Sequence, residues 1–222
     1  MKVRLAALLS AVVVVMLVVV PAWAAPEAPE ATNEWELTID LKPLASIQVA
    51  VPGEKNPRMF WFLRYTVSNH TGEDQIFAPD VFLYTDTGQI VRAGKDVPPA
   101  VFNRIKSSFN DPLLKDQTAI TGKLLQGEDN AKNGVAIFPT FDPKAGTVEI
   151  FFGGLSGYAE IIKLPVPVTV TEPDLKGNPR EVEKTELLLT KTLRLTYRHP
   201  VDPAGKPREK ELQLVRQDWV MR

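Results

Sequence analysis

Residues 59–91 read MFWFLRYTVSNHTGEDQIFAPDVFLYTDTGQIV, and this stretch decides the fold. In 59–68 an apolar side chain occupies every second position, so these side chains fall on one face of a strand. The other face begins apolar with Phe60 and Phe62 and becomes polar from Arg64 onward. A strand that starts buried on both faces and ends half-exposed suits the middle of a β-sandwich.

Turn signals follow this strand. Residues 69–74 (NHTGED) combine Asn and Asp, which tolerate left-handed backbone, with a Gly that adopts positive φ freely. A second strand is predicted at about 80–85, and the Asp-Thr-Gly at 86–88 predicts another turn after it. We therefore expect two central strands joined by a hairpin turn.

The N-terminal residues 1–24 are typical of an export signal. Lys2 and Arg4 precede the apolar run 5–20, and small residues mark a cleavage site after Ala24. An uncleaved membrane anchor is the alternative, because the run is only slightly shorter than the about 20 residues of a membrane span.

Residues 25–33, which are rich in Pro, Ala and Glu, predict a flexible linker. We expect 34–222 to form a single β-sandwich domain with extra C-terminal strands. The chain has 26 basic and 27 acidic side chains without a basic block, so no nucleic-acid partner is expected. It has no cysteine, so an exported domain must be stabilised by its core alone.

Further strands are predicted wherever apolar and polar residues alternate or a short apolar run is bounded by turns: 35–42, 47–51, 118–125 (weakly), 134–139, 147–152, 164–171, 187–197 and 212–221. In 164–171, Pro165 and Pro167 cannot donate ladder hydrogen bonds, so this strand belongs at a sheet edge. The segment 172–180 is expected to be a loop.

Residues 100–109 predict one short helix. Val101, Ile105 and Phe109 recur every four residues, two prolines precede the segment, and an Asp-Pro pair follows it. We expect its apolar stripe to pack on the sandwich, although a partner-binding helix would show the same pattern.

The sum is an all-β sandwich of about nine to eleven strands with one helical insertion and no βαβ alternation. Residues 60–152 contain the strand ending in V-x-N, the T-G-E-D turn, the F-L-Y-T-D-x-G strand and turn, and the segments L-L-Q-G-E, G-V-A-I-F and E-I-F-F. In these motifs they resemble the immunoglobulin-like β-sandwich domains of exported bacterial proteins, a group mostly of unknown function. The resemblance implies this fold and a periplasmic or extracellular location. It carries no catalytic residue.

No pattern for an enzyme occurs in the sequence. His70 and His199 are interpreted as turn residues rather than catalytic bases. The segment 154–158 (GLSGY) departs from a nucleophile elbow because Tyr replaces the final Gly. Glu149 and Glu160 stand out only as carboxylates beside glycines, and nothing singles out the facing pair that a glycosidase needs. We predict no catalytic residue and no cofactor.

Two loops are candidates for calcium. Gly127-Glu128-Asp129-Asn130 and Glu73-Asp74 carry hard oxygen ligands that one end of the sandwich can bring together. The alternative is that both loops are plain turns. The spacing after Asp129 does not fit an EF-hand because Ala131 fills the third position.

Three aromatic residues and one sequon remain. Trp61 is predicted to lie in the core. Trp35 and Trp219 are predicted to cap the sandwich, and an exposed sugar-binding platform would use similar residues. The triplet 69–71 (NHT) matches an N-glycosylation sequon.

The leading hypothesis is an exported, non-enzymatic binding or structural module that presents loops or a sheet edge to another envelope or extracellular protein. A carbohydrate- or calcium-binding domain is the alternative, and a hydrolase is the third hypothesis. The fold class does not choose among them, because sandwiches support many functions.

Overall fold

A computed structural model describes residues 35–173, 178–200 and 211–222 of the chain. The predicted export signal (1–24) and linker (25–33) lie outside these residues, as does the smaller of two compact units, Met1–Glu30. The larger unit, Ala31–Arg222, holds every described residue.

Strands are the main regular structure of the described residues, together with a single α-helix and one short 3-10 turn. In chain order the elements are β1 (Thr38–Leu41), β2 (Ala45–Val49), β3 (Arg58–Ser68), β4 (Gln75–Phe77), β5 (Asp80–Thr85), β6 (Ile90–Arg92), α1 (Pro99–Phe109), β7 (Gly122–Leu124), η1 (Glu128–Asn130), β8 (Lys132–Pro139), β9 (Thr147–Gly153), β10 (Ala159–Pro173), β11 (Pro179–Arg198) and β12 (Gln213–Met221).

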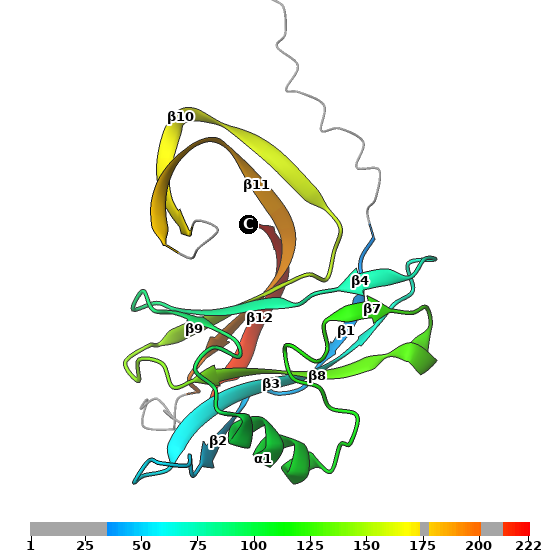
Figure 1. Ribbon diagram of the computed structural model, residues 1–222, viewed down its shortest axis with the longest axis vertical. Coiled ribbons are helices and arrows are strands. Elements are labelled where there is room, and N and C mark those ends of the chain that lie inside the picture. The colour runs from blue at the N-terminus through cyan, green and yellow to red at the C-terminus, as the bar shows by residue number, and fades with distance from the viewer. Residues whose placement is uncertain (1–34, 174–177, 201–210) are drawn as a thin grey trace, which may run out of the picture. The chain divides into compact units, whose positions relative to one another are not determined.

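Antiparallel pairing arranges these strands in two principal sheets (Figure 1). In the first sheet, β3 is central: β1 pairs with its C-terminal part, β2 with its N-terminal part, and β8 along its length. The second sheet has the order β10-β11-β9-β5-β6, and β12 pairs with β11 as well. A small third sheet contains β4 and β7.

The main core lies between the two principal sheets. From the first sheet, β3 contributes four of the five alternating side chains predicted to share one face, all except Met59, which is only partly buried. Strands β5, β9 and β11 of the second sheet contribute theirs: Trp61, Leu63, Tyr65 and Val67 face Val81, Leu83, Val148, Ile150, Phe152, Leu193, Leu195 and Tyr197. All of these side chains are buried. The all-β sandwich is therefore confirmed, and Trp61 is a core residue.

A second core cluster covers the other face of the first sheet. Phe60 and Phe62 of β3 pack there against Val101 and Ile105 of α1, and all four side chains are buried. The helix predicted at 100–109 is confirmed, and its apolar stripe packs on the sandwich. Figure 1 shows α1 lying against the first sheet. These contacts explain why β3 begins apolar on both faces.

The predicted hairpin between 59–68 and 80–85 is wrong. The two strands lie in different sheets, and β4 lies between them in the chain and pairs with β7. Each strand has one strongly apolar face, and packing these faces across a sandwich buries them without direct pairing. Alternation alone does not distinguish the two arrangements.

The strand count also differs from the prediction, with twelve strands among the described residues. Three of them, β4, β6 and β7, have three residues each and are too short to show a period. The predicted loop at 172–180 is partly strand, because β10 extends to Pro173 and β11 begins at Pro179. In 172–180 apolar and polar side chains alternate only weakly. The pairing there depends on backbone groups, which the sequence does not reveal.

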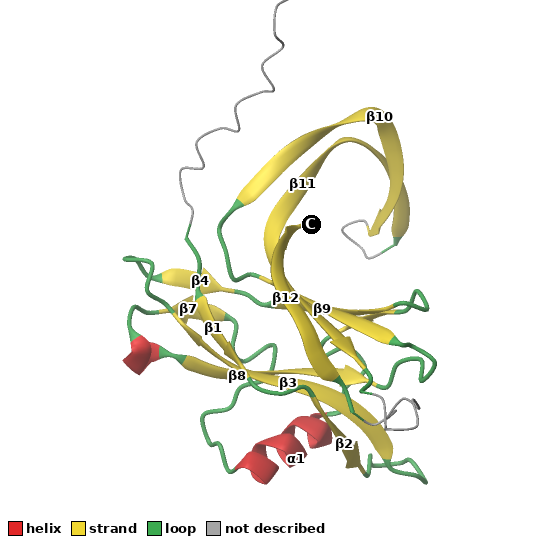
Figure 2. Cartoon of the chain, turned by 180° about the vertical axis from the view of Figure 1, so that it is seen from behind, coloured by secondary structure: helices red, strands yellow, loops and turns green. Residues whose placement is uncertain are grey.

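The edge position predicted for the proline-containing strand is confirmed, because β10 ends the order of its sheet. Together, β10 and Pro179–Thr190 of β11 form a two-stranded ribbon, named here the β10–β11 arm. Figures 1 and 2 show the arm, which is an extension of the second sheet, curling away from the rest of the sandwich. No helix in the described ranges is long and apolar enough to cross a membrane.

Tyr65 gives a test of the core. Its ring makes edge contacts with Phe77 and Phe152, and its hydroxyl is buried with no hydrogen-bond partner among the described residues. We expect Tyr65→Phe to raise the free energy of unfolding by about 1 kcal/mol, since it removes an unsatisfied buried polar atom. In Tyr84→Phe, the matched control, the lost hydroxyl is bonded to Arg222 and no gain is expected. Urea unfolding of the three proteins measures the difference.

Tyr65 should also make the stability of the fold depend on pH. Burial raises the pKa of Tyr65 above its ordinary value of 10.0, so the native state holds a proton that the unfolded state releases. Stability is therefore fully present below pH 10 and falls as the pH rises above it. The fall should be shallower in Tyr65→Phe, and part of it should persist because burial also raises the pKa of Tyr197 to about 12. An unchanged slope would contradict this account.

Candidate functional site

The described residues contain a pocket at the place where the arm leaves the sandwich. Its volume is about 540 Å³, and it is lined by residues from four segments: Trp35, Glu36, Ser156, Tyr158, Lys191, Trp219, Val220 and Met221. We call it the aromatic pocket. Two tryptophans that lie 184 positions apart in the chain, near the two ends of the described residues, meet in it.

A short backbone ladder builds one wall of the pocket. The N–H of Leu37 donates to the carbonyl of Leu155 at 2.8 Å, and the N–H of Gly157 donates to the carbonyl of Trp35 at 3.0 Å. Between these bonds, Glu36 and Ser156 form an isolated bridge. The segment before β1 is thereby fixed against the β9–β10 connection.

Position 157 requires a glycine because its backbone lies very close to the side chain of Trp35. A Cβ atom built on Gly157 would lie 2.3 Å from Trp35 Nε1, which is closer than any carbon makes contact. The glycine therefore lets the indole lie close against the backbone of the connection. In the sequence this glycine resembled part of a degenerate nucleophile elbow, but its role is to make room for the tryptophan.

The opposite wall is made by β11 and β12. Their register places Lys191 opposite Met221 and Leu193 opposite Trp219, so Trp219 shares the face of the core residue Leu193. Trp219 is half-buried and packs against the main core, as does Trp35. The prediction that both tryptophans cap the sandwich is confirmed.

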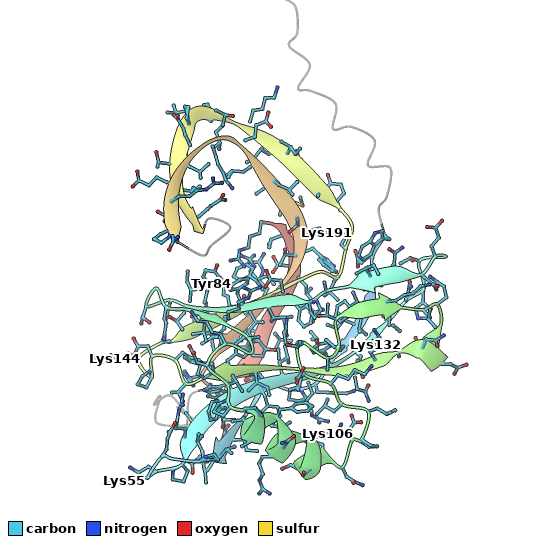
Figure 3. The ribbon with its side chains drawn as sticks, viewed as in Figure 1. Lys55, Tyr84, Lys106, Lys132, Lys144 and Lys191 are labelled. Carbon is cyan, nitrogen blue, oxygen red and sulfur yellow. The ribbon has the colours of Figure 1, made fainter. Side chains whose placement is uncertain are left out.

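Lys191, which Figure 3 labels, connects the two walls. Its Nζ lies 2.6 Å from Glu36 Oε2 and 4.9 Å from the ring centroid of Trp219. Both side chains of the ion pair remain about a third or more exposed, so the pair contributes at most about 1 kcal/mol. Its chief effect is to hold one ammonium and one carboxylate at the rim of an aromatic surface.

The two candidate histidines do not form a catalytic site. His70 Nε2 lies 2.8 Å from Glu128 Oε1, and the same oxygen accepts a hydrogen bond from Ser68 at 3.2 Å. A nucleophilic triad needs the imidazole between hydroxyl and carboxylate, whereas here the carboxylate lies between the other two. His199 follows β11, and its Nδ1 bonds the backbone carbonyl of Glu211 at 2.7 Å.

The candidate carboxylates are separated. Glu149 lies in β9, where it accepts a hydrogen bond from Thr196 and lies 3.8 Å from Arg194. Glu160 lies in the arm opposite Leu189. Glu149 lies opposite Thr196 of β11, seven positions along that strand from Leu189, so the structure does not bring the two carboxylates together as a hydrolytic pair.

The two candidate calcium loops do meet at one end of the sandwich. Gln126 donates from its side chain to the backbone carbonyl of Glu73, and from its N–H to the carboxylate of Asp74 at 3.3 Å. Asp74 is neutralised by Lys123 at 2.9 Å, and the hydrogen bond from that ammonium lowers the pKa of the Asp74 carboxyl. No group of three or more His, Asp or Glu side chains suited to a metal ion occurs in the described ranges.

The sequon at 69–71 has a structural role. Asn69 is fully buried, and its Nδ2 donates to the carbonyls of Glu73 and Leu124, both at 2.9 Å. Its Oδ1 accepts from the N–H and hydroxyl of Thr71. The nitrogen that would carry a glycan is thus used to fasten the turn.

These features define an all-β sandwich with an aromatic pocket at the root of a two-stranded arm. No protein-family model matches the chain, and no curated protein matches it. Among solved structures, the chain is similar to MPT63, a secreted protein from Mycobacterium tuberculosis solved at 1.5 Å, with 18% identity over 60% of this chain and 95% of that one. The TM-score is 0.31, and this similarity carries no argument about the pocket or the arm.

Gly157→Ala tests how the pocket is built. The added methyl group must displace Trp35, so we expect a loss of about 1–3 kcal/mol in unfolding free energy and a shift of tryptophan emission to longer wavelength. Gly146→Ala is the control, because its Cβ would meet only a carboxylate oxygen of Asp86, at 3.3 Å. Equal behaviour of the two variants would show that Trp35 does not depend on the glycine.

Proposed function

We propose that this protein is an exported, non-enzymatic binding module whose aromatic pocket binds a saccharide. The observation that carries the proposal is the meeting of Trp35, Tyr158 and Trp219 with the Glu36–Lys191 ion pair in one solvent-accessible pocket. Export is supported by the signal pattern at 1–24.

The chemistry of the pocket suits a sugar ring. Small-molecule sites combine aromatic surface with a few polar groups that fix orientation. A pyranose presents an apolar C–H face, which can stack on an indole, and hydroxyl groups at its rim. Glu36 can accept hydrogen bonds from those hydroxyls, and the ammonium of Lys191 can donate to them.

The charge of the pocket also favours a neutral ligand. Its one ammonium and one carboxylate are paired at 2.6 Å, so neither sign of charge is left in excess among the lining residues. A hydrolytic role is less well supported, since glycosidases use two carboxyl groups and the lining residues supply only Glu36.

The test is thermal unfolding of the full-length chain with a panel of soluble oligosaccharides. Ligand binding to the native state raises the midpoint by mass action, so at least one saccharide should raise it. We expect Trp219→Ala to abolish the shift. Ser107→Ala, on α1, which contributes no residue to the pocket lining, should keep it.

A second variant protects the test against a folding defect. Glu36→Gln with Lys191→Gln removes both charges and keeps a polar side chain at each position. It should weaken saccharide binding by about tenfold while leaving the unliganded midpoint within about 2 °C. No shift with any saccharide would refute the proposal. A shift with calcium alone would return the loops at 69–74 and 127–130 to consideration.

A further inference from the structure

The β10–β11 arm has one open edge and one protected edge. Its β10 edge carries Pro165 and Pro167, which cannot donate to a neighbouring strand. On the other side, β12 pairs with β11 only from Lys191 onward. In the part of the chain that the structure describes, no strand pairs with that side of β11 between 180 and 189, and this stretch contains no proline.

The hydrogen bonds at Thr190 show which backbone groups face the open edge. The N–H of Thr190 donates to the carbonyl of Arg222 at 2.7 Å, and its carbonyl accepts from Arg222 at 3.1 Å, on the β12 side. Lys191 donates instead to Tyr158, on the β10 side. Since this direction alternates along a strand, the even-numbered residues of β11 in the arm present their N–H and C=O groups at the open edge.

The alternation runs unbroken through the arm. A bulge separates the pair Lys163↔Glu186 from the pair Val168↔Lys184, and its extra residues all lie in β10. Thr185 is the only β11 residue between the two pairs. The open edge of β11 is therefore a regular, unpaired strand edge, which is a template for another strand.

Two copies of this edge can pair antiparallel only in certain registers. Outward-facing residues must oppose outward-facing residues, so even positions must meet even positions. A two-fold axis at Thr185 satisfies this rule and places Lys184 opposite the partner subunit's Glu186. By symmetry it also places Glu186 opposite the partner subunit's Lys184.

The same register pairs apolar with apolar. Val182 comes opposite the partner subunit's Leu188, and Leu188, which is 63% exposed in one copy, is covered in return. An axis at Lys184 instead of Thr185 would place Lys184 opposite the partner subunit's Lys184. An axis at Glu186 would place Glu186 opposite the partner subunit's Glu186. Like charges directly opposite each other are destabilising, so the register centred on Thr185 is better matched than either neighbouring register.

We propose that this chain forms a two-fold symmetric dimer by antiparallel pairing of the open β11 edges, centred on Thr185 and extending from Val182 to Leu188. The occupant of the edge is thus a second copy of this chain, with an isologous interface. Lys184, which forms an ion pair with Glu172 of its own β10, has donors to spare for the second carboxylate. This proposal is independent of the saccharide proposal, since the edge stretch and the pocket lining share no residue.

Cysteine cross-linking reads the register directly, because the chain contains no cysteine of its own. On the axis, Thr185 faces its own copy as a non-hydrogen-bonded pair, with Cα atoms about 4.5 Å apart, which suits a disulfide. We expect full-length Thr185→Cys, under mild oxidation, to form a covalent dimer on a non-reducing gel.

Glu183→Cys is the matched control. In the proposed register the two introduced thiols would lie about 13 Å apart along the strands, too far to bridge. Cross-linking of Thr185→Cys at least about tenfold faster than of Glu183→Cys supports the register. Preferred cross-linking of Glu183→Cys or Lys184→Cys would overturn it.

Charge exchange tests the same pairing without a covalent bond. Glu186→Lys places two lysine side chains opposite each other on both sides of the axis, and sedimentation equilibrium should show a dissociation constant raised by about tenfold or more. Adding Lys184→Glu restores opposite charges and should recover the dimer. Glu183→Lys makes the same charge change on the other face of the strand and should leave the constant within about threefold.

Recovery in the double variant separates pairing between subunits from damage within one arm, because Lys184→Glu also removes the ion pair with Glu172. A wild-type chain that stays monomeric at all concentrations would overturn the proposal. A dimer that is indifferent to Glu186→Lys would overturn it as well.

Discussion

The hydrogen-bond ladder along β11 is the constraint on which the rest of the structure depends. This strand of 20 residues pairs with β9 and β12 through its second half and with β10 through its first half. Its second half carries Leu193, Leu195 and Tyr197 into the main core. One continuous strand thus anchors the arm to the sandwich, because its second half is held by two ladders and by core side chains.

The pocket arises where the ladder changes partners. Lys191 of β11 lies opposite Met221, the last residue of β12, and the arm begins next to it. The side chain of Lys191 is also the one that contacts Glu36 and Trp219. From Pro179 to Lys191 no residue of β11 is buried, whereas buried residues begin at Thr192. Trp35 and Trp219 close the exposed end of the core, and their remaining surface forms the pocket wall.

The candidate site was only partly visible in the sequence. Trp35 and Trp219 could be named because large aromatic residues stand out in strand patterns, but 184 positions separate them and no spacing rule joins them. Lys191, Glu36 and Tyr158 look like ordinary surface residues of strands and turns. Their common position depends on which strands pair, and strand pairing is a long-range property. The calcium loops illustrate the opposite case, because the hydrogen bonds of Gln126 do join the two turns as expected, yet Lys123 and His70 already pair with their carboxylates.

The sequence by itself determined the sheet content, the faces of β3, the helix over the first sheet and the edge position of the proline-containing strand. Each of these follows from a local rule of side-chain period or backbone chemistry. Only the tertiary structure decided that β3 and β5 lie in different sheets, that β10 and β11 extend as an arm, and that two distant tryptophans meet. Those features depend on backbone ladders between remote segments, and a backbone group is the same in every residue but proline.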